Sequence, residues 1–208
     1  MVVAFVGPLS VWYARGGGDL LRLRTGVETW RADLRASVAA KVAQQLEWDE
    51  AAPASGEHDL GEAGWLALRL FALYAEHAEL ELPDTTPPLL EFDQQWRAAA
   101  DAKFATSKFG HLLACSMWLP GDFPVTLRVP LPDGATAELG SLSVLHDQLR
   151  WLNERTFQAS VAEVAAWREL QAPAGGVLLD AARRGYAALF AATAAAVRLR
   201  TPVAIAER

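Results

Sequence analysis

The chain of 208 residues contains a single cysteine, Cys115. One cysteine excludes an intrachain disulfide and every paired-cysteine metal or redox motif, and it fits a reducing compartment. The alanine-rich segment 185–197 is uncharged, but it is shorter than the roughly 20 residues that span a bilayer, so we expect a buried helix there. Residues 1–18 lack the positively charged start of a secretory signal. We therefore expect a cytoplasmic protein without a membrane partner.

Positive charge is also in short supply. The chain has 19 lysine and arginine residues against 25 acidic residues, a formal net charge of −6 and a pI of about 5.2. Such a balance disfavours a phosphate backbone as the main partner, so we expect no nucleic-acid binding. Arginine far outnumbers lysine and alanine is abundant, a usage that is typical of a GC-rich bacterial genome.

Strong catalytic, metal and nucleotide motifs are missing from the sequence. The glycines at 16–18 and 174–176 match neither glycine-rich phosphate motif, so we interpret both segments as turns. The four histidines show no HExxH or HxxxH spacing. His77 and Glu81 could supply two ligands on one helix face, but two ligands do not make a metal site. We therefore expect no metal and no cofactor.

The most regular pattern that is present lies between Val125 and Leu139, VTLRVPLPDGATAEL. Apolar and polar residues alternate on both sides of Pro-Asp-Gly, which favours a tight reversal of the chain. A three-residue loop places Leu127 opposite Leu139 and Arg128 opposite Glu138. The sequence therefore predicts a β-hairpin at about 125–139, with Arg128 on its outer face.

The other segments predict a short N-terminal strand and a majority of helices. Apolar residues at 2–6 favour a strand, and alternation over 9–25 across the glycines predicts a second hairpin. Residues 49–60 contain proline, glycine and acids and predict an exposed loop. Helical periodicity predicts helices from residue 27, at 61–79, 89–104 and 108–117, after the capping residues Ser141 and Ser160, and after residue 176.

This order of elements lacks the βαβ alternation of a parallel sheet. With 52% hydrophobic residues the chain can fill a sizeable core, and its length suits one domain. We therefore predict an α+β fold for residues 1–208. The expected protein is a helix-dominated single domain with an N-terminal β segment and a second β-hairpin at about 125–139.

Two sets of residues are candidates for function. His111 and Cys115 lie four apart on a predicted short helix, so an imidazole there could activate a thiol nucleophile. Against this, free cysteine is often buried, apolar residues surround it, and no acid to orient the histidine can be identified. The second set contains the tryptophans that fall off the predicted apolar stripes and could mark a partner surface: Trp12, Trp48, Trp118 and Trp167.

From these observations we expect a non-catalytic protein-interaction domain. Such a domain would bind a protein partner or associate with itself, for example as a homodimer. Two alternatives stay open. One is a small hydrolase or transferase that uses Cys115 with His111, and it requires an accessible thiol within reach of an imidazole. The other is a small-ligand sensor with an apolar pocket between the central helix and the sheet.

Overall fold

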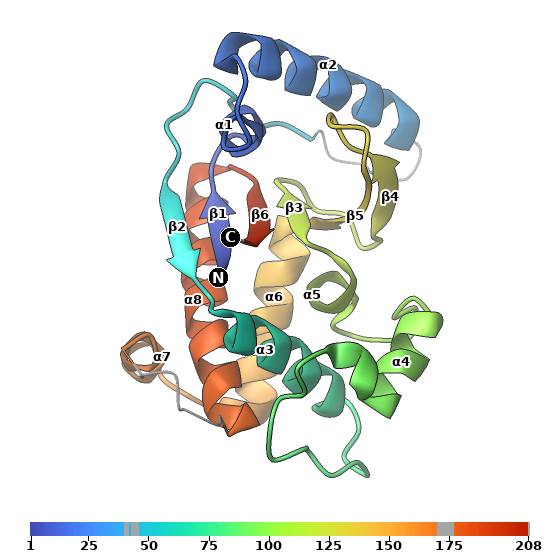
Figure 1. Cartoon of the computed structure of the whole chain (residues 1–208), viewed down its shortest axis with the longest axis vertical. Helices are drawn as coiled ribbons and strands as arrows, with labels where there is room; N and C mark the ends of the chain where they lie inside the picture. The colour runs from blue at the N-terminus through green and yellow to red at the C-terminus, as the bar shows by residue number, and fades with distance from the viewer. Residues whose placement is uncertain (40–41, 43–45, 170–176, 208) are drawn as a thin grey trace.

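The computed structural model describes residues 1–39, 42, 46–169 and 177–207. These residues form an α+β fold in which helices predominate and pack on both faces of one mixed sheet (Figure 1). The predicted turn at 174–176 lies outside the described residues.

The sheet has six strands in the order β2-β1-β6-β3-β5-β4. Neighbouring strands are antiparallel except β3 and β5, which are parallel. The strands are β1 (Val2–Val6), β2 (Gly56–Asp59), β3 (Met117–Leu119), β4 (Leu127–Pro130), β5 (Thr136–Ser141) and β6 (Val203–Glu207).

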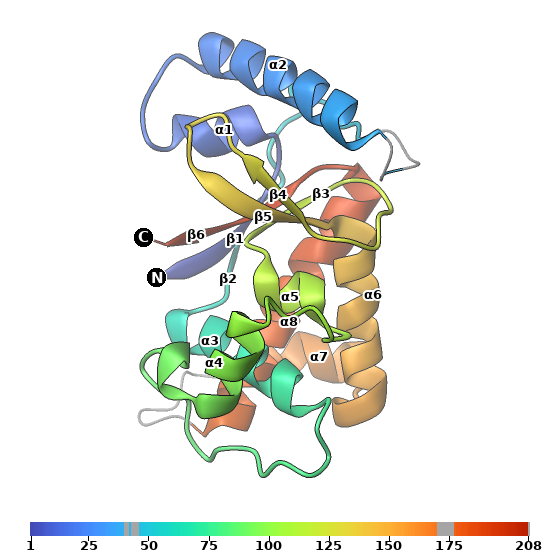
Figure 2. The same ribbon diagram turned by 90° about the vertical axis from the view of Figure 1, so that its right-hand side faces the viewer.

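Two apolar clusters lie on the two faces of the sheet, because successive side chains of a strand point to opposite sides. In β3, Trp118 belongs to the larger cluster, whereas Met117 and Leu119 belong to the smaller one. Figure 2 shows α1 and α2 above the sheet and the other helices below it. The smaller cluster is covered by α1 (Leu9–Ala14) and α2 (Leu20–Val38), and the larger by α3 (Glu62–Tyr74), α5 (Gly110–Ala114), α6 (Leu142–Leu152) and α8 (Leu178–Leu199).

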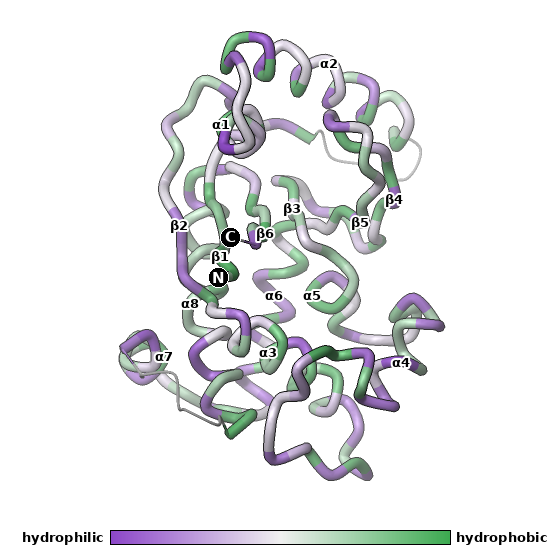
Figure 3. The backbone as a smooth tube through the Cα atoms, viewed as in Figure 1, coloured by the Kyte–Doolittle hydropathy of each residue, from purple (hydrophilic) through white to green (hydrophobic). Residues whose placement is uncertain are grey.

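The shorter elements lie around these layers. They are the 3₁₀ helix η1 (Leu90–Phe92), α4 (Gln94–Asp101), the π-helical turn η2 (Asn153–Phe157) and α7 (Val161–Trp167). Figure 3 shows hydrophilic and hydrophobic residues alternating along α2, as expected for a helix that buries one face. Its buried residues are Val27, Leu34 and Val38.

The predicted hairpin is confirmed in its register. Leu127 lies opposite Leu139 and Arg128 opposite Glu138, and Arg128 is exposed. Gly134 has a φ of 85°, a conformation that glycine adopts without steric cost. The predicted caps are also present: the Ser141 hydroxyl accepts a hydrogen bond from Val144 N, and Ser160 forms a capping box with Glu163.

The predicted hairpin over residues 9–25 is wrong, because α1 and the start of α2 are helical. The carboxylate of Glu50 accepts hydrogen bonds from Leu9 N and Ser10 N at 3.0 and 2.8 Å, and it thereby satisfies two amides that the first turn of a helix leaves free. Asp19 accepts a bond from Leu21 N in the same way at α2. Leu9, Trp12 and Tyr13 also have the i, i+3, i+4 spacing of one helix face, and these caps favour the helix.

The loop predicted at 49–60 is also partly wrong. It contains strand β2 and the buried residue Glu50. Strands β3 and β6 were not predicted. Strand β3 has only three residues and β6 only five, two of them alanine, so neither shows a clear alternation of apolar and polar residues. Three predicted helices are shorter than expected: α3 ends at Tyr74, α4 ends at Asp101 and α5 ends at Ala114.

Candidate functional site

A cleft of about 900 Å³ opens between α1, the start of α2, the tip of the β4–β5 hairpin and the end of β6. We name it the α1 cleft. Its volume is within the range of pockets that hold ligands or peptide side chains. It is lined by Trp12, Tyr13, Arg15, Gly16, Gly17, Leu23, Asp133, Ile205, Ala206 and Glu207.

Local sequence places the two aromatic side chains on this cleft. Leu9 is buried and packs α1 against the sheet. Trp12 and Tyr13 follow three and four residues later, so they lie on the same side of the helix one turn on, where both are half-buried. Trp12 contacts Phe5 of β1 with ring centroids 5.7 Å apart. Gly17 has a φ of 93°, so this position suits the sharp change of direction between α1 and α2.

Arg15 lines the α1 cleft and is held by two contacts. Its guanidinium lies 2.6 Å from the carboxylate of Glu57 and 5.1 Å from the ring centroid of Trp12. The ion pair offsets this positive charge locally. Two further lining residues, Asp133 and Glu207, are acidic, and the described residues provide no ion pair to either. The unpaired charge of the cleft is therefore negative.

Tyr13 carries an unusual polar group. Its hydroxyl is buried and has no hydrogen-bond partner among the described residues. Burial raises the pKa of Tyr13 above its ordinary value, and the carboxylates of Asp133 and Glu50 add to the increase. The phenol is therefore protonated near neutral pH and keeps an unused hydrogen-bond donor, whose oxygen is closed off from solvent in the free protein.

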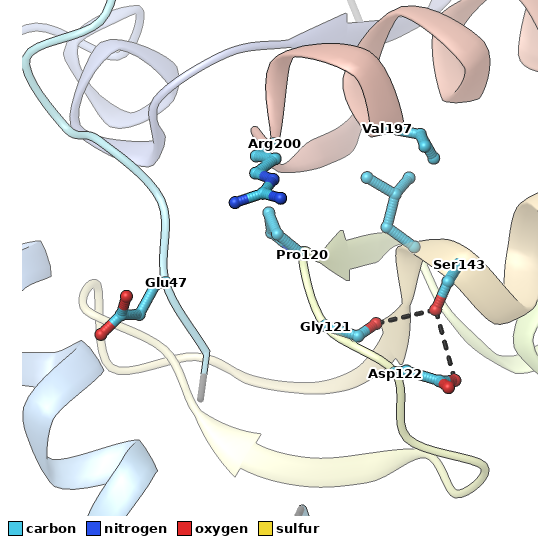
Figure 4. Close-up of a pocket in the computed structure, with 8 residues that line it drawn as sticks. Glu47, Pro120, Gly121, Asp122, Ser143, Val197 and Arg200 are labelled. Carbon is cyan, nitrogen blue, oxygen red and sulfur yellow. Dashed lines mark hydrogen bonds between the residues drawn. The ribbon is translucent and has the colours of Figure 1, made fainter. Parts of the chain in front are cut away.

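A second cavity, of about 370 Å³, lies where the loop after β3 meets the N-terminus of α6 (Figure 4). The Ser143 hydroxyl donates to the Gly121 carbonyl at 2.9 Å, and Asp122 Oδ1 is 3.4 Å from it. Figure 4 shows Arg200 and Glu47 standing apart from this group. Among the described residues that line the cavity there is no histidine, and the long contact with Asp122 makes a weak hydrogen bond. The arrangement does not supply an activated serine.

His111 and Cys115 have different surroundings in the structure. Helix α5 ends at Ala114, and Cys115 has an extended backbone with φ −101° and ψ 151°, so the two residues do not share a continuous helix. His111 Nδ1 accepts a hydrogen bond from Ser141 N at 2.9 Å, and Nε2 lies 3.3 Å from the Pro124 carbonyl. Both ring nitrogens are thus engaged with the backbone rather than with the thiol.

The surroundings of the two groups disfavour proton transfer between them. Burial lowers the pKa of His111. Burial also raises the pKa of the Cys115 thiol, with Glu138 adding to the increase and Arg69 opposing it. Cys115 is only 2% exposed. A neutral imidazole that bonds to the backbone and a protonated, buried thiol give no thiolate nucleophile near neutral pH.

The four candidate tryptophans do not gather on one surface. Trp118 is fully buried and donates from Nε1 to the His111 carbonyl at 3.0 Å. Trp48 is buried and donates to the Glu50 carboxylate. These two indoles are therefore parts of the core, since each polar edge finds an internal acceptor. Trp12 lines the α1 cleft, whereas Trp167 packs against Phe157 and Tyr186 near α8.

Among the described residues, no group of three or more His, Cys, Asp or Glu side chains could hold a metal ion; His77 instead pairs with Glu79 at 3.2 Å. Within the same residues, no helix has the length and the apolar character needed to cross a bilayer.

Sequence reasoning identified Trp12 but missed its neighbours in the α1 cleft. Tyr13, Arg15 and Asp133 lie in segments interpreted as strand or turn. A signal was available in the spacing of Leu9, Trp12 and Tyr13, which suits one helix face. The approach of the hairpin tip to α1 had no signal in the sequence. A scan against protein-family models and searches of curated proteins and of solved structures find no match.

Proposed function

We propose that the protein acts as a non-catalytic binding module that holds a segment of a partner protein in the α1 cleft. The observation that carries this proposal is the pair of half-buried aromatic residues, Trp12 and Tyr13, that line the cleft, with a Tyr13 hydroxyl just behind its wall that has no partner among the described residues. Aromatic side chains with one polar edge are favoured at protein interfaces, because they combine apolar area with a directional hydrogen bond.

The rim of the cleft supports a protein partner. Leu20 and Leu21 at the start of α2 are 39% and 70% exposed, and Leu23 of the same turn lines the cleft. Neighbouring exposed leucines next to half-buried aromatic rings form the apolar centre that an interface needs. The pair proposed for the enzyme alternative does not compete with this proposal, because the Cys115 thiol is buried and His111 bonds to the backbone.

The test is a panning of displayed linear seven-residue peptides against the whole chain, followed by titration of the selected peptides. Tyr13→Phe removes only a hydroxyl that has no partner in the free protein. We expect this variant to keep its thermal stability and to lose about five- to tenfold in affinity, the equivalent of one hydrogen bond of about 1 kcal/mol.

Tyr74→Phe is the matched control. The Tyr74 hydroxyl donates to Asp93 Oδ2 at 2.8 Å and is not part of the α1 cleft. We expect this variant to lose about 1 kcal/mol of stability and to keep full affinity. Failure to select any peptide, or equal affinity of the wild type and Tyr13→Phe, would overturn the proposal. Selective binding of a small molecule or of a second copy of the chain would replace the proposed partner.

A further inference from the structure

The sheet has an empty strand position beside the α1 cleft. In β3, Met117 lies opposite Ala204 of β6 on one side and opposite Leu139 of β5 on the other. One more bond, from Ile205 N to the Ser116 carbonyl at 2.8 Å, extends this pairing. Ser116 is preceded by Cys115, whose backbone is extended, and then by α5, which packs with α3 and α6. Beyond Cys115, therefore, the line of β3 no longer separates β6 from β5.

The backbone of β5 faces this position. Leu131 N donates to the Ala135 carbonyl, and the Pro130 carbonyl accepts from Trp30 Nε1 at 2.7 Å instead of bonding to β5. Since hydrogen-bonded and non-bonded pairs alternate in an antiparallel ladder, the pair Pro130–Thr136 is a non-bonded one. The N–H and C=O groups of Thr136 consequently point away from β4 and toward the line of β3.

The end of β6 faces the same position from the other side. Gly7 N donates to the Pro202 carbonyl on the β1 side, and Ile205 N donates to Ser116 on the β3 side. Alternation along the strand therefore directs Glu207 N–H toward the line of β3. The two edges are two strand spacings apart where β3 ends, on the order of 9.6 Å, which admits one extended chain.

Figure 2 shows the β4–β5 hairpin and the end of β6 running apart from each other, with α1 behind the hairpin and above β6. Asp133 at the hairpin tip and Ile205, Ala206 and Glu207 of β6 line one continuous cleft. The carboxylates of Asp133 and Glu207 give its mouth a negative charge, because Arg15 is already paired with Glu57. This charge is complementary to a basic side chain.

We infer that the partner segment enters the α1 cleft as an extended strand that fills the empty position between β6 and β5 and carries a basic side chain toward Asp133 and Glu207. The inference rests on the proposed function, and it specifies the partner as an extended, basic peptide segment. Main-chain bonds at an exposed strand edge supply affinity in this mode, and alternate side chains supply specificity.

The test is amide hydrogen exchange of the whole chain, measured by NMR with and without the selected peptides. Strand addition slows exchange of the Thr136 and Glu207 amides by about tenfold or more, because each gains a hydrogen bond. The Arg128 amide is the matched control. It belongs to a non-bonded pair with Glu138, so it points to the outer edge of β4 and keeps its exchange rate.

A charge variant tests the basic side chain separately. Asp133→Asn keeps the side-chain oxygen that accepts from Ala135 N at 3.0 Å but removes the charge. We expect about three- to tenfold weaker binding of the selected peptides and a smaller salt dependence. Asp147, an exposed residue of α6, lies outside the cleft, and Asp147→Asn is expected to change neither quantity.

The outcomes separate this inference from the proposed function. If Tyr13→Phe weakens peptide binding while the Thr136 and Glu207 amides stay unprotected, the peptide occupies the cleft without strand addition and the inference is overturned. Selection of acidic peptides, or equal binding by Asp133→Asn, overturns the basic partner. Absence of any peptide binding removes the proposed function itself.

Discussion

Gly185 of α8 lies directly against the backbone of Gly64 in α3. A β-carbon added at Gly185 would come within 2.6 Å of the Gly64 carbonyl carbon. The two helices thus cross at a distance that only glycine permits at this point. Because α3 and α8 together carry much of the larger apolar cluster, this crossing fixes how the helical layer sits on the sheet.

We predict that Gly185→Ala lowers the free energy of unfolding by about 1–3 kcal/mol or more, because the helices must separate to admit the methyl group. Urea unfolding at equilibrium measures this change. Gly26→Ala in α2 is the matched control, since a β-carbon there meets nothing within 4 Å. That variant gains about 0.5–1 kcal/mol from the intrinsic preference of alanine for helices. Equal stability of Gly185→Ala and the wild type would contradict the close crossing.

Glu50 connects the N-terminus of α1 to the segment before β2 through hydrogen bonds. Glu50 is 2% exposed, and its carboxylate accepts from Leu9 N, Ser10 N and Trp48 Nε1. We predict that Glu50→Ala costs about 3–5 kcal/mol, because three buried donors lose their acceptor. Glu50→Gln keeps one acceptor oxygen and is expected to lose less.

Glu47→Ala is the control for Glu50. The Glu47 side chain is 63% exposed and pairs with Arg35, so its removal is expected to change stability by less than about 1 kcal/mol. The measurement is again urea unfolding. If Glu50→Ala and Glu47→Ala lost the same small amount, Glu50 would not be the residue that holds α1.

The elements that the sequence predicted well are those in which local pattern and tertiary structure agree. The hairpin register followed from alternation on both sides of Pro132-Asp133-Gly134, and the solvent side of Arg128 followed with it. Ser141 and Ser160 cap helices because their hydroxyls find first-turn amides within three residues. These contacts are local, so sequence alone determines them.

The elements that the sequence did not predict depend on distant partners. The helical state of α1 depends on Glu50, which is 41 positions from Leu9. Strand β6 is placed between β1 and β3 by pairing with residues more than 80 positions away. The α1 cleft combines α1, the hairpin tip and the end of the chain, so Tyr13 and Asp133 could not be joined before the fold was known.

Acidification should destabilise the protein through the buried His111 and the half-buried His58 and His146. Burial lowers the pKa of His58, His111 and His146 below the ordinary value of 6.5. The unfolded chain therefore takes up protons near pH 6.5 while the folded chain stays neutral. The contribution of these histidines to the free energy of unfolding is fully present above about pH 7. It falls as the pH decreases from 6.5 toward the pKa values of the folded state, by at most about 1.4 kcal/mol per pH unit for each histidine.

Urea unfolding at pH 7.5, 6.5 and 5.5 measures this dependence, in a range where exposed carboxylates do not titrate. His111→Asn should reduce the slope, because His111 must stay neutral at Nδ1 to accept from Ser141 N. His146→Gln, which removes a half-buried ring bonded to Thr193, provides an independent measurement. Stability that rises on acidification from pH 7.5 to 5.5 would contradict the lowered pKa values.

Cys115 provides the sharpest distinction between binding and covalent catalysis. Burial raises the pKa of its thiol, and the thiol is the reactive group only as a thiolate. We predict that iodoacetamide at about pH 7.5 modifies the native protein more than about 100-fold more slowly than the urea-unfolded protein, because modification must wait for local opening. Mass spectrometry of the intact chain follows the reaction, and Cys115→Ala, which has no thiol, gives the background. Alkylation at comparable rates in both states would mean an accessible thiolate, and the hydrolase or transferase alternative with His111 would then displace the binding proposal.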